Sequence, residues 1–566
     1  MIAAARDRLI ERLLAERNAS GHWSGELASS ALSTATASIA LHLAEPGNAL
    51  TAKGLDWLEL TQNDDGGWGD TVLSISNIST TALCWAALTI GGRESDAAEV
   101  WMLNAAGSLE PWDLAQAITA RYGKDHTFSV PILTTLAIAG IVPWDYVPAL
   151  PFELAAFPRE WYSVLGLPVV SYALPALIAI GHVHHRLAPS PNPILRFARK
   201  RAAARTLKIL EGIQPENGGF LEATPLTSFV SMSLCAAGYT DHPVLALGLQ
   251  FLRNSMQPDG SWPIDTNLAT WVTTLSVNAL GNHLPAEGRA PIRDWLLSQQ
   301  YKTVHPYTGA APGAWSWTDL PGGVPDADDT PGALLALAKL DPHNPGVIAA
   351  ASNGVQWLLD LQNRDGGIPT FCRGWGKLPF DRSSPDLTAH TLHAWSVWKS
   401  VNPRTEDAMN RALHFLEGAQ RADGAWVPLW FGNQYARNDE NPVYGTARVL
   451  ASLQHVQPES EMTVDAVMWL LDVQNDDGGW GGDRGVASSI EETALAVSAL
   501  HGFFGQSVAV AIEGGVNWLV EATKGGEETP PTPIGFYFAK LWYFEKLYPL
   551  IFAADALGRV MPHFES

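Results

Sequence analysis

The sequence predicts an all-α protein made of repeated helical hairpins and divided into two large domains. The chain has 566 residues, which exceeds the size of one ordinary domain. A short unit recurs along it, and segments with apolar residues at helical spacing follow each copy. Helix pairs repeated this often either close into an α/α barrel or extend as a solenoid.

The repeated unit is an aromatic or aliphatic residue with leucine, then glutamine, then an acidic Gly-rich turn and usually an aromatic residue. One copy reads Trp469-Leu470, then Gln474, then Asn-Asp-Asp-Gly-Gly before Trp480. The glycines end one helix and turn the chain, while Trp and Leu pack inward. We interpret the Trp and Gln of the unit as structural. Other copies occupy residues 57–68, 209–220, 252–262, 357–368 and 415–426, with a fainter one at 295–300 and a half copy at 20–23.

The copies fall into two groups, separated by a proline-rich region at about 113–208 that holds no clear copy. The strongest run lies after about residue 267. We therefore expect one domain made of residues 1–30 and 267–566, and a second domain made of residues 31–266.

Composition excludes some classes of partner. The net charge of −22 argues against nucleic acid, because phosphate binding needs clustered Lys and Arg. It does not exclude a membrane, since attachment can be apolar. Cys84, Cys235 and Cys372 lie far apart, so neither a disulfide framework nor a zinc finger is expected. The N-terminus predicts an amphipathic helix rather than a signal peptide, which favours a cytoplasmic protein.

Residues 161–181 contain no charged side chain. The stretch is of borderline length for a membrane span, and Pro168 and Pro175 interrupt it. We favour a buried core helix over a transmembrane helix here.

The sequence Asp326-Ala-Asp328-Asp329-Thr330 places three carboxylates directly before an apolar helical run at 334–338. A magnesium–diphosphate site usually has DDxxD spacing, which differs from the D-x-D-D spacing of this chain. Asp329 lies near the expected helix start, so its carboxylate is a candidate for capping helix N–H groups. Capping accounts for one of the three carboxylates but not for all of them.

A strong Brønsted acid accounts for the cluster better. Three neighbouring carboxyls cannot all ionise at low cost, so at least one is expected to keep a proton. Such a group can protonate an alkene where water is excluded. Asp386 and His390 lie one helical turn apart, so His390 is a candidate cation beside the acid, with Asp386 holding it charged. The alternative is a core histidine whose hydrogen bonds are satisfied.

Together, the repeats, the motif at 326–330 and the pair Asp386 and His390 resemble the squalene–hopene cyclases and related class II terpene cyclases. The resemblance spans nearly the whole chain. It implies two α/α (toroid) barrel domains built from QW-type repeats, with the catalytic barrel carrying the DxDDT motif. It also implies an isomerase-type enzyme of triterpenoid or hopanoid biosynthesis that needs no metal and no redox cofactor.

The resemblance assigns roles within the acid motif. Asp328 matches the aspartate that donates a proton to the terminal alkene, and the flanking Asp326 and Asp329 would tune it.

The remaining acid-site residues also follow from the resemblance. His390 matches the histidine that hydrogen-bonds the acid, and Asp386 matches the carboxylate behind that histidine. Tyr444 matches a tyrosine linked to hydration and reprotonation of the acid.

Aromatic positions of the substrate cavity carry over as well, because an aromatic face stabilises a carbocation without trapping it. Trp317 stands where the family has a phenylalanine that stabilises early carbocations, and Tyr172 stands where a tryptophan is usual. The other matching positions are Trp271, Trp430 and Phe536. The chain is shorter than typical triterpene cyclases, and Lys540 is unexpected in a C-terminal aromatic segment that matches loosely. These departures leave the product and the substrate length open.

Three functions are therefore weighed. The first is a cyclase of squalene or a similar linear polyprenoid. The second is a class II cyclase of farnesyl or geranylgeranyl diphosphate, which needs a basic patch and often magnesium; the domain with the acid motif shows no obvious Lys/Arg cluster. The third is a non-cyclising helical barrel like the prenyltransferases, whose zinc site uses Asp-x-Cys with a distant His. None of the three cysteines lies in that pattern.

A squalene-like substrate also implies a membrane partner, because such a molecule resides in the bilayer. We expect a peripheral, monotopic protein at the inner face of the cell membrane, with residues 161–181 or 128–151 contributing the apolar surface. The sequence leaves the oligomeric state open, a homodimer included.

Overall fold

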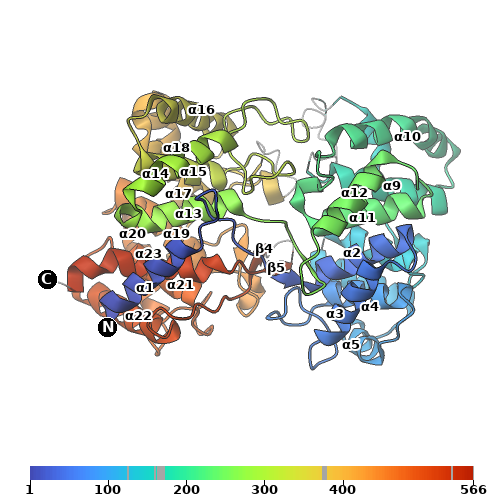
Figure 1. Cartoon of the computed structure of the whole chain (residues 1–566), viewed down its shortest axis with the longest axis horizontal. Helices are drawn as coiled ribbons and strands as arrows, with labels where there is room; N and C mark the ends of the chain where they lie inside the picture. Colours follow the sequence, from blue (N-terminus) through green and yellow to red (C-terminus); the bar gives the residue numbers. More distant parts are fainter. Residues whose placement is uncertain (124–125, 159–160, 162–171, 372–378, 537–539, 565–566) are drawn as a thin grey trace.

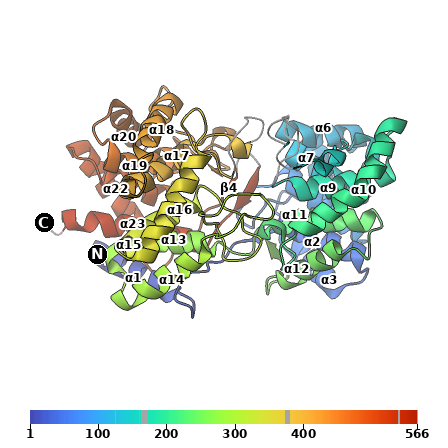
Figure 2. The same ribbon diagram turned by 90° about the horizontal axis from the view of Figure 1, so that it is seen from above.

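The computed structural model describes residues 1–123, 126–158, 161, 172–371, 379–536 and 540–564. Helices form two lobes side by side, and the chain passes between the lobes twice (Figures 1 and 2). Both chain ends lie in one lobe, which we call the larger barrel; the other lobe is the smaller barrel. This architecture confirms the predicted all-α fold.

The larger barrel is a closed double ring of helices. Each inner helix contacts the next one along the chain, and the last contacts the first, so the ring closes. This closure decides between the two expected architectures in favour of an α/α barrel. The inner helices are α13 (Ala269–Leu280), α15 (Asp329–Leu340), α17 (Pro385–Val397), α19 (Pro442–Val456), α21 (Ile490–Leu500) and α23 (Leu547–Phe564). The outer helices are α14 (Ala286–Gln299), α16 (Pro345–Leu361), α18 (Thr405–Ala419), α20 (Glu461–Asp472), α22 (Gln506–Ala522) and α1 (Ile2–Ala15).

The smaller barrel repeats this plan, and its inner helix α11 contacts α2 to close the ring. Its inner helices are α2 (Ala31–Ala44), α4 (Ile78–Ile90), α7 (His126–Ile138), α9 (Leu174–Leu187) and α11 (Thr224–Ala236). Its outer helices are α3 (Ala49–Leu60), α5 (Asp96–Ala106), α6 (Pro111–Tyr122), α10 (Pro193–Ile213) and α12 (Pro243–Asn254). These two sets are drawn from the part of the chain that the structure describes.

Short strands and 3-10 helices join the rings. Strands β1 (Ser29–Ser30) and β2 (Trp262–Pro263) pair antiparallel, and β3 (Phe431–Gly432), β4 (Ile534–Phe536) and β5 (Leu541–Tyr543) form an antiparallel sheet in that order. The 3-10 helices are η1 (Trp144–Tyr146), η2 (Phe152–Ala156), η3 (Phe220–Glu222), η4 (Gly281–His283), η5 (Pro379–Asp381), η6 (Lys399–Val401) and η7 (Arg437–Asp439).

The repeated unit stops one helix and ties it to its neighbours by hydrogen bonds. In the copy after α20, Trp480 Nε1 donates to the carbonyl of Leu470 at 2.9 Å, and the Trp480 backbone N–H donates to Thr493 Oγ1 at 2.9 Å. Gln474 Nε2 donates to the carbonyls of Gly478 and Ala511, the latter on α22. The Trp480 bond satisfies the Leu470 carbonyl in the last turn of α20, where helix carbonyls lack intrahelical partners, and the Gln474 bonds tie the turn to α22. The same tryptophan bond to a leucine ten residues earlier occurs at Trp23, Trp68, Trp262 and Trp426.

Two hydrophobic clusters fill the barrels. One contains buried residues from 5–27 and 264–560, and the other contains buried residues from 31–262 together with Tyr307 and Val324. We propose the domain bounds 1–30 with 267–566 and 31–266 on this basis.

Within the uncharged stretch, residues 174–181 lie mostly buried in inner helix α9, whereas Trp161 is exposed. Residues 162–171 lie outside the described residues. Val130, Leu133 and Leu136 of α7 are buried in the smaller barrel, whereas residues 143–151 are mostly half-buried or exposed, so a membrane contact by the segment 128–151 stays a prediction. In the described chain, none of the helices combines the length and apolar character that crossing a bilayer requires.

Candidate active site

Backbone hydrogen bonds hold the acid motif in place just before α15. The N–H of Asp326 donates to the carbonyl of Trp315 at 3.0 Å, and that of Ala327 donates to the carbonyl of Thr370 at 2.9 Å. Thr330 Oγ1 donates to the Asp326 carbonyl at 2.6 Å and accepts the Trp315 N–H at 3.1 Å. The motif therefore sits between two loops that fix its backbone on both sides.

Asp326 caps α15. Its Oδ1 accepts the N–H groups of Asp328 at 2.9 Å and Asp329 at 2.7 Å. The expectation that Asp329 has this role is corrected, because Asp329 is itself the first residue of α15. A capping oxygen reaches N–H groups two or three residues further along the chain, so the capping carboxyl must precede the helix.

The three carboxyls differ in exposure. Asp326 and Asp329 are each 3% exposed, whereas the Asp328 side chain is 22% exposed. Burial raises the pKa of Asp326 to about 8, and the charge of Asp328 adds to the rise. Burial also raises the pKa of Asp329 well above its ordinary value, with further contributions from Asp326 and Asp328. The two buried carboxyls therefore hold protons at neutral pH more readily than free carboxyls do.

His390, on α17, lies beside the exposed carboxyl, with its Nδ1 3.5 Å from Asp328 Oδ1. Burial lowers the pKa of His390, although Asp328 acts in the opposite direction. The Asp386 carboxyl accepts a short hydrogen bond from Ser384 Oγ, and burial raises its pKa to about 6. Burial therefore disfavours the imidazolium, whereas Asp328 favours it, and the role of Asp386 in holding His390 charged stays a prediction. The hydrogen bond of the Asp386 carboxyl goes to Ser384.

Two tyrosines, Tyr444 and Tyr543, lie near the same acid, and Tyr548 contacts Tyr543. Tyr444, near the start of α19, is buried, and burial raises the pKa of its hydroxyl, with Asp328 and Asp386 adding to the rise. Tyr543 is buried as well, and its hydroxyl lies 3.2 Å from that of Tyr548. Sequence reasoning did not single out Tyr543 or Tyr548 as site residues. Their only signal was the aromatic C-terminal segment.

Trp271 joins this tyrosine pair to the acid. Its Nε1 donates to Tyr548 Oη at 3.0 Å, and its ring lies edge-on to the His390 ring with centroids 6.3 Å apart. The Trp271 backbone N–H donates to the carbonyl of Trp317 at 3.1 Å. Trp271 thus connects the acid site to the neighbouring aromatic cluster.

That aromatic cluster brings together three of the sequence-predicted residues. Phe371 lies 6.3 Å from Trp317 and 5.9 Å from Trp430 between ring centroids. Phe380 lies 4.3 Å from Tyr172 and 4.9 Å from Trp430. Phe371 and Phe380 had no motif to identify them, and they complete the cluster. Tyr172 reaches it from the smaller barrel, so the cluster lies where the two barrels meet.

Phe536 belongs to β4, and its backbone pairs with Phe431 of β3. The side chain of Phe536 lies outside the described part of the structure. Phe431 packs against Tyr444 with ring centroids 4.7 Å apart, so this sheet borders the acid site.

The inner helices of the larger barrel begin at this site. Trp271, Asp329, Asp386, Tyr444 and Tyr548 all lie within the first three residues of their helices. Helix N-termini carry partial positive charge, which favours a carboxylate left behind after a proton is donated. Within the described residues, no set of three or more His, Cys, Asp or Glu side chains is grouped so as to hold a metal ion.

Profiles of one protein family match most of the chain. The profile of the squalene-hopene cyclase C-terminal domain matches residues 264–561, and that of the N-terminal domain matches residues 6–173. A probable squalene–hopene cyclase from Sinorhizobium fredii is 26% identical over 632 residues, covering 95% of this chain and 94% of that protein. Enfumafungin synthase from Hormonema carpetanum is 27% identical; the match covers 86% of this chain but only 42% of that protein.

Two other similar proteins are named as synthases of a diphosphate. A copalyl diphosphate synthase from Streptomyces cyslabdanicus is 29% identical over 306 residues, covering 53% of this chain and 49% of that protein. The solved ent-copalyl diphosphate synthase from Streptomyces platensis shares the fold with a TM-score of 0.56 at 19% identity, covering 99% of both chains. With a family profile matching more than half of its length, this chain belongs to the squalene-hopene cyclase family of class II terpene cyclases.

Proposed function

We propose that Asp328 protonates the terminal alkene of squalene or a similar linear polyprenoid and so starts a carbocation cyclisation. The observation that carries this proposal is the difference in exposure within the acid motif. Asp328 alone of the three carboxyls keeps an accessible side chain, while Asp326 and Asp329 are buried. Only an accessible carboxyl can touch an alkene.

The buried neighbours support the donor. Asp326 and Asp329, with raised pKa values, keep protons in the cluster, so a proton reaches Asp328 without three negative charges accumulating. After donation, the Asp328 carboxylate is stabilised by His390 at 3.5 Å and by the N-terminus of α15. General acid catalysis of this kind contributes about 10²–10⁴-fold in rate.

Asp386 and Tyr444 lie behind this acid as positioning and relay groups. The raised pKa of the Tyr444 hydroxyl means that it stays protonated and can donate a hydrogen bond. In this role Tyr444 would help water return a proton to the acid after each turnover, while Asp386, bonded to Ser384, keeps the start of α17 in place.

The aromatic cluster suits the cation that the acid creates. Trp317, Trp430 and Tyr172, joined by Phe371 and Phe380, present ring faces and edges within one group. A ring face attracts a cation by its quadrupole and offers no lone pair that captures it. We assign Trp271 and Phe536 to the same surface, as the family resemblance implies.

The second candidate function is cyclisation of a prenyl diphosphate, such as farnesyl or geranylgeranyl diphosphate. The observation that favours it is the copalyl diphosphate synthase relative, whose 29% identity spans about half of each chain. Protonation at Asp328 would be the same in both candidates.

Parallel incubation separates the two. The purified protein is given squalene or geranylgeranyl diphosphate, and the products are identified by mass spectrometry; Asp328→Asn serves as the inactive control. Cyclic products from squalene alone support the first candidate, and cyclic products from the diphosphate alone support the second. Cyclic products at an unchanged rate in the Asp328→Asn protein contradict the assigned role of Asp328.

We further propose that the protein docks peripherally on an anionic membrane. On α10, Ile194 is 78% exposed and Phe197 is 67% exposed. The same helix exposes basic side chains, among them Lys200 and Arg201, although the whole chain carries a charge of −22. Exposed Phe157, beyond η2, extends this surface, because η2 packs against α10. Apolar side chains combined with basic ones are typical of interfacial helices.

Flotation with vesicles tests the membrane proposal. Binding to vesicles with anionic lipid should weaken in a Phe197→Glu protein and with rising salt. Equal flotation of wild type and variant would contradict the assignment of this surface.

A further inference from the structure

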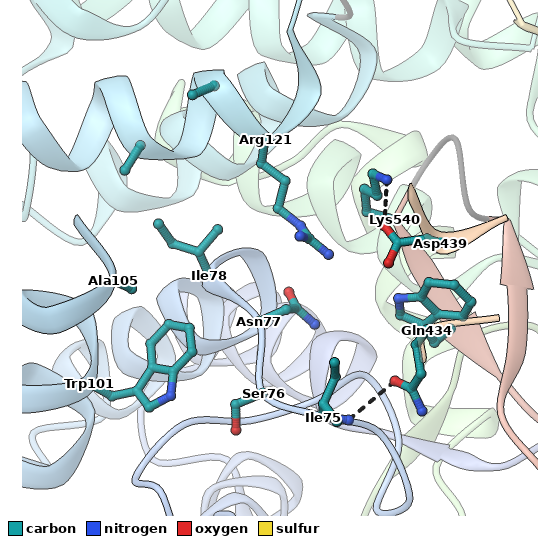
Figure 3. A pocket seen from close by; sticks show the side chains of 13 residues that line it. Ile75, Ser76, Asn77, Ile78, Trp101, Ala105, Arg121, Gln434, Asp439 and Lys540 are labelled. Carbon is teal, nitrogen blue, oxygen red and sulfur yellow. Dashed lines mark hydrogen bonds and ion pairs between the residues drawn. The ribbon is translucent and has the colours of Figure 1, made fainter. Parts of the chain in front are cut away.

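A pocket of about 590 Å³ lies between the two barrels, on the side of the β4–β5 hairpin (Figure 3). The smaller barrel contributes residues 75–78 and side chains of α5 and α6. The larger barrel contributes Gln434, Asp439, Lys540 and Trp542. This volume falls within the range of about 300–1,000 Å³ that small-molecule sites occupy.

One cation in this pocket has a buried nitrogen without a hydrogen-bond partner among the described residues. Arg121, on α6, extends into the space between Asn77 and the pair Asp439–Lys540 (Figure 3). Its Nε is buried and makes no hydrogen bond within the described residues. A buried polar donor without a partner costs about 1–3 kcal/mol, so a hydrogen-bond acceptor that enters the pocket would stabilise this group.

Among the described residues, the neighbouring polar groups make no hydrogen bond to Arg121 Nε. Asn77 uses Oδ1 to accept the N–H groups of Ser79 and Thr80, and its Nδ2 donates to Asp70. Asp70 is fully buried behind Asn77 and already accepts from Asn77, Thr80 and the N–H of Trp542. Burial raises the pKa of Asp70, whereas its hydrogen bonds and the charge of Arg121 lower it, so Asp70 offers Arg121 a nearby charge but, among the described residues, no hydrogen bond.

A second cation stands on the opposite wall. Lys540 Nζ lies 2.5 Å from Asp439 Oδ2, and both residues have positive φ angles, 53° and 61°. Backbone conformations of this kind in non-glycine residues are costly and concentrate at functional sites. An ammonium has three donors, so Lys540 can bind Asp439 and still donate to a ligand. Counting Arg121, Lys540 and Asp439, the charged side chains of the lining sum to one positive charge.

Apart from the polar Ser76, Asn77 and Gln434, the rest of the lining is apolar or aromatic. Ile75, Ile78, Ala117 and the ring of Trp542 form walls around the two cations. A ligand for this pocket therefore needs an anionic head and an apolar body.

We propose that this pocket binds an amphipathic molecule through a phosphate or diphosphate head held by Arg121 and Lys540. A planar guanidinium matches a phosphate with two parallel hydrogen bonds. The two cations come from opposite ends of the chain and from different barrels, which explains why the sequence shows no basic cluster. Binding at this pocket does not depend on the proton transfer at Asp328.

Two kinds of molecule have this chemistry: a prenyl diphosphate and a short-chain phospholipid. Titration calorimetry on the full-length Asp328→Asn protein, chosen to prevent turnover, compares geranylgeranyl diphosphate, geranylgeraniol and dihexanoyl phosphatidic acid. We expect Arg121→Gln to weaken binding of at least one phosphate ligand by about 10- to 100-fold, the range for a lost charged hydrogen bond. Geranylgeraniol should bind both proteins equally, and the ligand that responds to Arg121 identifies the source.

Two further variants control for the change in net charge and for misfolding. Arg484→Gln removes an exposed arginine that pairs with Asp472, so it reports the effect of net charge alone. Ala120→Phe fills the pocket from α6 without altering either cation, so it should weaken the same ligand if Arg121→Gln fails to fold. Unchanged affinity in both pocket variants, an equal loss in Arg484→Gln, or no binding of any phosphate ligand would overturn the proposal. If the wild-type protein cyclises neither squalene nor geranylgeranyl diphosphate while Arg121-dependent binding remains, the proposed function is contradicted and the pocket proposal stands.

Discussion

Asp326 has two roles that a pair of substitutions can separate. Its Oδ1 accepts two backbone N–H groups, those of Asp328 and Asp329, at a position that is 3% exposed. Asp326→Ala leaves both donors without an acceptor. At about 1–2 kcal/mol for each lost bond, the start of α15 should lose about 2–4 kcal/mol. Asp326→Asn keeps an acceptor oxygen and should cost much less, while removing the titrating carboxyl.

Hydrogen exchange followed by mass spectrometry measures this difference locally. Because each 1.4 kcal/mol corresponds to a factor of about ten, the amides of Asp328 and Asp329 should exchange about 30- to 700-fold faster in Asp326→Ala. They should change little in Asp326→Asn. Asp360→Ala, at an exposed residue of α16, is the control. Equal exchange rates in the Ala and Asn proteins would refute the capping role of Asp326.

Three further outcomes follow from the site and the repeats. Asp328→Asn should reduce cyclisation by about 10²–10⁴-fold while circular dichroism stays unchanged, since the Asp328 side chain makes no capping bond; a rate like that of Asp360→Asn would contradict this. The pKa of Asp326 rises from 3.8 to about 8, so the folded chain binds this proton more tightly than the unfolded chain does. The resulting stability is complete below pH 3.8 and is lost as pH rises toward 8; urea unfolding should show this fall in wild type and a smaller one in Asp326→Asn. Trp480→Phe strands the Leu470 carbonyl and should cost about 1–3 kcal/mol in urea unfolding, whereas no change would show that the bond is dispensable.

The repeats made the fold predictable, because each unit carries its own local physics. The positive φ of Gly478, the carbonyls bound by Gln474 and the Trp480 bond to Leu470 all lie within one copy or its neighbour. A helix stop, a turn and an inward-facing aromatic need no information from distant segments. Closure of the hairpins into a ring does depend on distant segments. It rests on contacts between α13 and α23, the first and last inner helices of the larger barrel along the chain.

The candidate site was predictable only in part. The acid motif is contiguous, so Asp326, Asp328 and Asp329 stood out from the sequence. Phe371 and Phe380 did not, because an isolated phenylalanine carries no signal until folding places it between known partners.

The sequence by itself determined which chemistry is available: a cluster of carboxyls before a helix, repeated hairpins and the family to which the chain belongs. The tertiary structure decided which group does what. The fold directs Asp326 Oδ1 to the N–H groups at the start of α15, and burial raises the pKa of Asp326. The Asp328 side chain stays accessible, and burial lowers the pKa of His390. The tertiary structure also brings Arg121 and Lys540 into one pocket. The physical reason is that exposure, pKa and partners depend on which distant segments exclude water from a residue, and only the folded chain sets those neighbours.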